Sequence, residues 1–213
     1  MSVIDATGCP TKAASDRASA APAVGALRAM LVELGELLGG MSDDHYVGSP
    51  SAGFTGSIGA HVRHCLDHVA ALTDHALSHD SGACSSPLHG SAPDDGELDY
   101  DRRERGTAIE HERTAALREI ERLQARLSGI ETMSSERPIR VRGAFCAEGD
   151  CVSGPSSLGR ELLFVISHTV HHNALLAAMC AALAVRTPVR FGYAPATLAH
   201  LDRTACAPSA SSR

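Results

Sequence analysis

Residues 161–179 read ELLFVISHTVHHNALLAAM, and this stretch decides both the fold class and the candidate chemistry. Its apolar residues recur every three or four positions, which predicts an amphipathic α-helix. His168 and His172 are four residues apart, so their imidazoles project from one side of that helix, about one turn apart. A helix offers two nitrogens to one metal ion at this spacing. The pair alone is a weak motif, because such histidines are more often structural.

The helical wheel gives the pair more weight. It puts His168 and His172 in the apolar stripe, together with Glu161, Phe164 and Val165. Buried imidazoles need partners, because an unsatisfied polar group in a core costs roughly 1–3 kcal/mol. A shared metal ion would meet that need. His171 falls outside the centre of this face, so we expect it to be exposed or at the rim.

A second histidine-rich stretch, SIGAHVRHCLDH, occupies residues 57–68. His61, His64, His68 and His75 fall within a wedge of about 60° at the border of the apolar face of a second helix. The alternative is a solvated polar edge, which is the usual neighbour of a core stripe. Helical bundles build metal sites from side chains on facing helices, so this helix is expected to add one histidine to the pair. Geometry alone leaves His61, His64 and His68 open for that position.

Three histidine ligands without a fourth would leave an open position for water, as in catalytic zinc sites. Imidazole also suits nickel, iron and copper, so the ligand type does not fix the metal. The ion would lower the pKa of a bound water or thiol and so provide a nucleophile at neutral pH. We therefore expect a divalent metal ion (Zn, Ni or Fe) and a small-molecule substrate.

The periodicity of the whole chain predicts an all-α protein, a four-helix bundle with a possible short β-hairpin over 137–153 between helices three and four. Ser57 or Thr55 would cap the second helix, Thr107 with Glu110 fits a capping box in the third, and Ser156 or Ser157 would cap the fourth. The expected helices are 21–41, 55–79, 102–127 and 156–185, and a short one after Pro195. The expected domain limits are a disordered tail over 1–21, the bundle over 22–202 and a second tail over 203–213.

Composition narrows the function. The formal net charge of −6 argues against nucleic acid as the main partner. We find no run of about 20 apolar residues and no signal peptide, which predicts a cytoplasmic protein without a membrane partner. Twelve histidines are an excess that gathers in two short stretches. Seven cysteines with irregular spacing indicate free thiols rather than a disulfide framework.

At residues 57–68 and 161–179 the chain resembles the DinB-like superfamily of bacterial four-helix metalloproteins, over roughly residues 20–200. Members show a Ser-Ile-Gly opening followed by a histidine seven residues after the serine, which here is His64. They also show a His-x-x-His-His cluster whose first and last members bind metal, here His168 and His172. Asn173 follows this cluster where many members have Arg-Gly-Gln. The resemblance thus implies the metal ligands His64, His168 and His172.

The resemblance further implies an up-down-down-up helix order and a homodimer. It also implies a metal-dependent enzyme, either a transferase that uses a low-molecular-weight thiol cofactor such as bacillithiol or mycothiol, or a hydrolase. The alternative is a non-catalytic, stress-associated metal-binding bundle. Polar groups around the open ligand position would favour the enzyme, and a dry apolar cap would favour the binding protein.

Three further sets of residues are candidates for chemistry. Glu161 shares the histidine face and is a candidate catalytic residue, either accepting an imidazole N–H or acting as a general base. A helix-dipole role at the first turn is the simpler explanation. Asp101, Arg102 and Arg103 are candidates for the mouth of the site, although a solvated charge run is expected at a helix start. Cys146 and Cys151 are a weak signal for a zinc clip or a redox pair.

Overall fold

The computed structural model describes residues 19–50, 53–78, 96–102, 106–144 and 151–205. These residues form seven helices and three strands, so the chain is mostly helical with a small mixed sheet. The long helices are α2 (Ala21–Gly39), α4 (Ile58–Ser78), α6 (Arg113–Ile130) and α7 (Leu158–Ala182). The short ones are α3 (Asp43–Val47), α5 (Ala108–His111) and α8 (Pro195–Ala205). The strands are β1 (Leu98–Asp99), β2 (Pro138–Ala144) and β3 (Cys151–Ser157).

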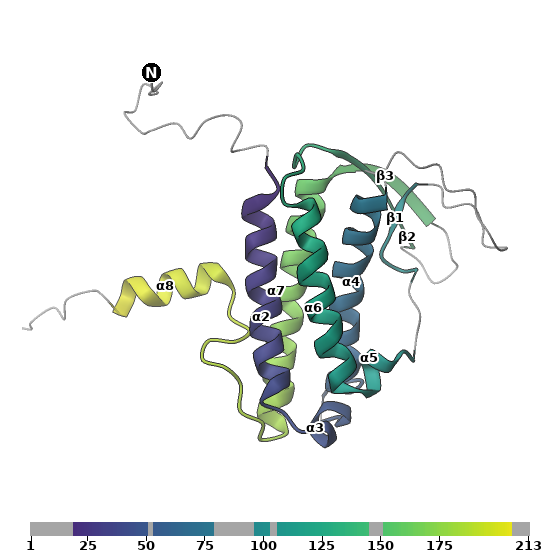
Figure 1. Ribbon diagram of the computed structural model, residues 1–213. Coiled ribbons are helices and arrows are strands. Elements are labelled where there is room, and N and C mark those ends of the chain that lie inside the picture. The colour runs from purple at the N-terminus through teal and green to yellow at the C-terminus, as the bar shows by residue number, and fades with distance from the viewer. Residues whose placement is uncertain (1–18, 51–52, 79–95, 103–105, 145–150, 206–213) are drawn as a thin grey trace, which may run out of the picture.

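The four long helices lie side by side (Figure 1). Both α2 and α4 pack against both α6 and α7. In Figure 1, α2 and α7 run in one direction, and α4 and α6 run in the other. The predicted tails lie largely outside the described residues. Ala20, inside the predicted N-terminal tail, is fully buried, and its N–H donates to the Met133 carbonyl at 3.0 Å.

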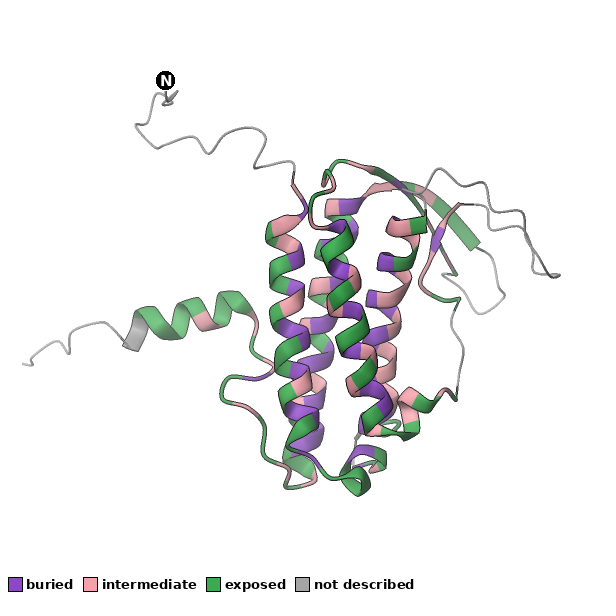
Figure 2. Cartoon of the chain, viewed as in Figure 1, coloured by how far each residue is buried: buried purple, intermediate pink, exposed green. Residues whose placement is uncertain are grey.

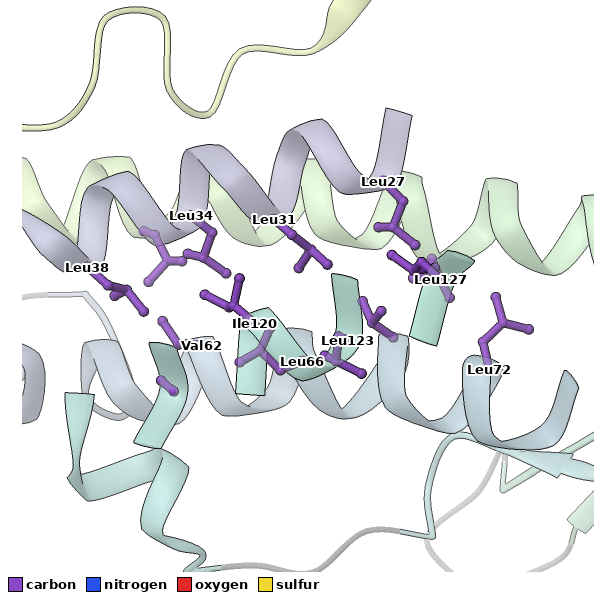
Figure 3. Close-up of a cluster of buried hydrophobic side chains, with 14 of the residues drawn as sticks. Leu27, Leu31, Leu34, Leu38, Val62, Leu66, Leu72, Ile120, Leu123 and Leu127 are labelled. Atoms are coloured by element: carbon purple, nitrogen blue, oxygen red, sulfur yellow. The ribbon is translucent and has the colours of Figure 1, made fainter. Parts of the chain in front are cut away.

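The core is aliphatic, as the scarcity of aromatic residues requires. Figure 2 shows buried positions along the inward faces of the long helices, and Figure 3 shows leucines from α2, α4 and α6 meeting between them. Each fully buried leucine contributes roughly 1.5–3 kcal/mol relative to an exposed one. The side chains labelled in this cluster are Leu27, Leu31, Leu34, Leu38, Val62, Leu66, Leu72, Ile120, Leu123 and Leu127.

Two of the predicted helix caps are confirmed and one is wrong. The Ser57 hydroxyl accepts from the Ala60 N–H at 3.1 Å, and the Ser157 hydroxyl accepts from the Arg160 N–H at 3.3 Å. Thr107 is the N-cap of α5 but forms no side-chain cap hydrogen bond. The capping box fails there because the Glu110 carboxylate pairs instead with Arg63 of α4 at 3.0 Å. The expected third helix is accordingly divided into α5 and α6, with the break at Glu112.

The extended segment predicted over 137–153 is present. Strands β2 and β3 pair antiparallel from Pro138↔Ser157 to Ala144↔Cys151, and the predicted turn at 148–150 lies outside the described residues. The two-residue strand β1 adds a parallel pairing, Leu98↔Val141, that sequence periodicity did not predict. Leu98 and Ile139 are buried and join the core, so the sheet is fixed to the bundle at the end where α7 begins.

Helix α7 is long and apolar enough to cross a membrane by length and composition alone, which differs from the expectation that no stretch would be. It packs against α2 and α4 and carries a fully buried Glu161. These contacts account for its apolarity as that of a core helix. Helix α8 extends away from the four long helices, and its side chains are largely exposed where they are described (Figures 1 and 2).

The short helix α3, in a segment predicted to be a loop, packs against the first turn of α4. A Cβ atom on Gly59 would lie 2.1 Å from the Glu110 carbonyl oxygen and 2.8 Å from Cε1 of the buried Tyr46. The Tyr46 hydroxyl donates to the Ile109 carbonyl at 2.5 Å, so α3, α4 and α5 meet at this point. Only glycine permits such a close approach of backbones.

Gly59→Ala is therefore expected to destabilise the fold by about 1–3 kcal/mol or more, because a backbone carbonyl cannot move aside as a side chain would. Gly25→Ala in α2 is the matched control, since nothing lies within 4 Å of its Cβ position. It should stabilise by about 0.4–1 kcal/mol. Urea denaturation of both variants measures the difference. Equal stabilities would contradict the close packing at Gly59.

Candidate metal centre

The antiparallel packing of α4 against α7 brings the two histidine stretches together. Nε2 of His64 lies 3.1 Å from Nε2 of His168. The rings of His64 and His172 are 4.7 Å apart between centroids, and those of His168 and His172 are 4.5 Å apart. The three residues implied by the resemblance thus lie at one place between two helices.

His68 lies in the same cluster and is buried. Its Nδ1 is 2.9 Å from the backbone carbonyl of His64. A carbonyl oxygen can only accept, so Nδ1 carries the proton, which makes Nε2 the candidate ligand atom. A backbone carbonyl that holds the second ring nitrogen in this way is the usual support of a metal-binding histidine.

One nitrogen from each of His64, His68 and His168 lies within 4.8 Å of the other two, so these three could hold a metal ion. Two imidazole nitrogens bound at the usual zinc distance of about 2.0–2.1 Å in a tetrahedron would be about 3.3 Å apart. The observed 3.1 Å between His64 and His168 is close to that separation. The donor set fits a divalent metal, and His64 and His168 belong to both candidate trios.

The other histidines have separate places. His172 is buried beside both shared ligands, and its ring is also 5.6 Å from that of His61. Nε2 of His61 lies 3.0 Å from the Thr55 carbonyl, so that nitrogen donates away from the cluster. His171 is exposed, as predicted. His168 itself is half-buried, whereas Thr169, His172 and Asn173 lie in the buried stripe of α7.

Glu161 is fully buried, and both its oxygens are occupied by protein donors. Oε2 accepts from the Tyr100 hydroxyl at 2.9 Å. Oε1 accepts from the Ser156 hydroxyl at 2.5 Å and from Arg160 at 2.8 Å. The carboxylate therefore ties β3 and the segment after β1 to the first turn of α7. These bonds make Glu161 an anchor, and its role as a general base stays a prediction.

Tyr100 links Glu161 to the histidine cluster. The Tyr100 ring stacks on His68 at 5.2 Å with an interplanar angle of 11°, and His68 stacks on His168 at 3.9 Å. Burial, and then the Glu161 charge, raise the pKa of the Tyr100 hydroxyl above its ordinary value, so it stays a neutral donor at physiological pH. His68 is thus held between two rings, with its Nδ1 proton fixed by a carbonyl.

A pocket of about 530 Å³ opens beside His68. The sheet forms one wall, and the first turns of α7 form another. The size is within the range of small-molecule sites. Asp101 lines it as proposed, Arg102 is exposed, and Arg103 lies outside the described residues. Its lining residues are His68, Tyr100, Asp101, Val141, Arg142, Gly143, Ala144, Val152, Gly154, Pro155, Ser156, Arg160, Glu161 and Phe164.

The described cysteines near the cluster are core residues. Burial raises the pKa of Cys65 to about 11, and its thiol donates to the Thr169 hydroxyl at 3.6 Å. Burial likewise raises the pKa of Cys180 to about 11. Both therefore stay protonated at neutral pH, and neither is a ready thiolate ligand. Cys151 is exposed at the start of β3, and Cys146 lies outside the described residues.

No protein-family model matches the chain. A curated protein of Rhizopus delemar called FK506-binding protein 5 is 33% identical over 107 residues, which are 50% of this chain. The match spans 28% of the length of that relative.

The histidine trio can be tested by metal content. His64→Ala and His168→Ala should each reduce bound zinc to near zero, because His64 and His168 are members of both candidate trios. His68→Ala should weaken zinc binding more than His172→Ala, because a ring nitrogen of His68 lies within 4.8 Å of those of His64 and His168. Plasma emission spectrometry of dialysed protein and competition with a zinc chelator measure these effects.

His171→Ala is the matched control, because this exposed histidine should leave the zinc content unchanged. A larger loss for His172→Ala than for His68→Ala would assign the third position to His172, as the resemblance implies. Full zinc content in His64→Ala and His168→Ala would exclude the site.

The anchor can be tested separately. Glu161→Gln places an amide where the carboxylate accepts three donors, and the mismatch should cost about 1–3 kcal/mol of unfolding free energy. Glu131→Gln removes a surface ion pair with Arg28 and should change stability by at most about 1 kcal/mol. Urea denaturation compares the two. If the Glu161→Gln protein is as stable as the control, the buried hydrogen bonds of Glu161 do not contribute to the free energy of unfolding.

Proposed function

We propose that the chain is a divalent-metal-dependent enzyme of the DinB-like superfamily, acting on a small molecule in the pocket beside His68. His64 and His168, with His68 or His172 as the third ligand, would hold a zinc, nickel or iron ion. The proposal rests on one observation. His68 belongs to the histidine trio and also lines the pocket of about 530 Å³. Substrate in that pocket would lie next to the ligand set.

The arrangement of the helices supports membership of the superfamily. Helices α2 and α7 run against α4 and α6, which is the up-down-down-up order expected from the resemblance. The quoted motifs lie on α4 and α7, two helices that pack together. A homodimer and a cytoplasmic location belong to the same proposal.

Several residues of the site would have separate roles in the reaction. When bound, the metal ion supplies Lewis-acid chemistry and lowers the pKa of a water or of a low-molecular-weight thiol. His68 would bind through Nε2, because its Nδ1 donates to the His64 carbonyl at 2.9 Å. Tyr100, held by Glu161, fixes the His68 ring and covers that side of the cluster from water. Substrate is positioned by the sheet wall and by Phe164.

The second candidate is a non-catalytic metal-binding bundle, and a specific observation favours it. His172 is buried, and its ring centroid lies 4.7 Å from that of His64 and 4.5 Å from that of His168, so a fourth imidazole lies beside the trio of His64, His68 and His168. Four protein ligands would close the site, as in structural zinc centres. The name of the Rhizopus relative refers to a longer protein, and FK506 binding stays a property of that protein.

Turnover separates the two candidates. Zinc- or nickel-loaded protein should catalyse a reaction from a panel of thiol conjugations and amide hydrolyses. His168→Ala should lose more than about a hundredfold in rate, because several kcal/mol of charge stabilisation disappear. His171→Ala should keep metal and most of the rate. Melting temperatures are needed alongside, since a metal that binds only the folded state also stabilises it.

X-ray absorption of the zinc-loaded protein should report three imidazole ligands and one non-imidazole ligand. Four imidazoles, together with a rise in melting temperature on adding zinc and no turnover on the panel, would replace the enzyme with the binding protein.

A further inference from the structure

The pocket beside the histidines offers a ligand more hydrogen-bond donors than acceptors. Its two acidic side chains already accept from the protein. Glu161 accepts from three donors, and Asp101 Oδ2 accepts from the Ala144 N–H at 3.1 Å. Both oxygens of Glu161, and one oxygen of Asp101, are therefore engaged before any ligand enters.

The two arginines of the lining keep unused donors. A guanidinium carries five N–H groups. Arg160 uses one of them toward Glu161 at 2.8 Å, while its side chain remains 65% exposed. Arg142 is exposed and hydrogen-bonds to Cys151. The acidic neighbours of Arg142 are Asp99 and Glu97. Asp99 accepts from the backbone N–H of Asp101 at 2.8 Å, and Glu97 is engaged by Arg140 at 3.1 Å and by Ser153 at 2.9 Å.

The rest of the lining is apolar and partly open. Phe164 is 36% exposed and Val152 is 58% exposed, and both face the pocket together with Tyr100. The Phe164 and Tyr100 rings lie 5.1 Å apart, and the Arg160 guanidinium lies 5.7 Å above the Phe164 ring. Exposed apolar side chains at the rim of a pocket indicate a ligand with an apolar or aromatic body.

From this balance we infer that the pocket binds an aromatic or apolar oxyanion, such as a carboxylate, with its body on Phe164 and Tyr100 and its charged end on Arg142. The inference rests on the proposed function, because it names the substrate class of the same site. Arginine suits this role because its planar fork matches a carboxylate with two hydrogen bonds. Arg142 is the specificity-determining residue of the pair, since the charge of Arg160 is already paired with that of the buried Glu161 at 2.8 Å.

The test compares 2-naphthoate with 2-naphthamide, which has nearly the same shape and no charge. Calorimetry on the full chain should show naphthoate binding at least about tenfold more tightly, as charge-assisted hydrogen bonds provide. Arg142→Gln should remove most of this preference and leave naphthamide binding unchanged. Arg142→Lys should restore part of it, because the charge returns without the fork.

Arg140→Gln is the matched control. It removes the same charge from the same strand, two residues away, from a side chain that does not line this pocket. It should keep the preference for naphthoate. Equal losses in Arg140→Gln and Arg142→Gln would indicate a general field effect and overturn the inference. Equal binding of the two probes to the unmutated chain would overturn it as well.

The metal ion could itself attract a carboxylate, so both probes are also measured on chelator-treated protein. A preference that survives removal of the metal assigns anion recognition to Arg142. A preference that vanishes with the metal overturns the inference and leaves the proposed metal enzyme intact. A chain that holds no metal yet prefers naphthoate through Arg142 would defeat the proposed function while the oxyanion pocket stands.

Discussion

One buried negative charge organises the functional end of the molecule. Glu161 has no exposure to solvent, and a carboxylate in that position is tolerated only if it is neutralised and hydrogen-bonded. Its partners come from three places: Tyr100 after β1, Ser156 in β3, and Arg160 in α7. Satisfying this one group therefore fixes the sheet against the helix and creates the pocket wall. It also sets the ring that stacks on His68.

The candidate metal centre is asymmetric in a way that bears on its chemistry. On one side His68 opens to a pocket with arginines and aromatic rings, which suits a site that admits a substrate. On the other side His172 is buried among core residues. Which of these two completes the trio with His64 and His168 thus decides how the ion would face the pocket. Either one alone, with the shared pair, would leave a ligand position open for catalysis, whereas both together would close the site.

Much of the fold could be predicted because helical periodicity and capping are local signals. The helix ends at Ser57 and Ser157 and the extended segment before α7 follow from a few neighbouring residues. Local signals gave wrong or missing predictions where residues that are distant in the sequence interact. Arg63 draws the Glu110 side chain away from the expected capping box, and β1 is a two-residue strand that exists only through its pairing with β2.

The site was predictable as a set of histidines but not as a geometry. The spacing of His168 and His172 and the stretch with His64 identified the two helices that meet. Sequence could not show that His68 has its tautomer fixed by a backbone carbonyl, since that bond depends on ring orientation. Sequence also could not show that Glu161 anchors Tyr100, because the two residues are 61 positions apart in the chain. His64 and His168 are themselves 104 residues apart. Neither half of the chain could therefore assemble the donor set by itself, and any fluctuation that parts α4 from α7 would dismantle it even while α2 and α6 remained packed.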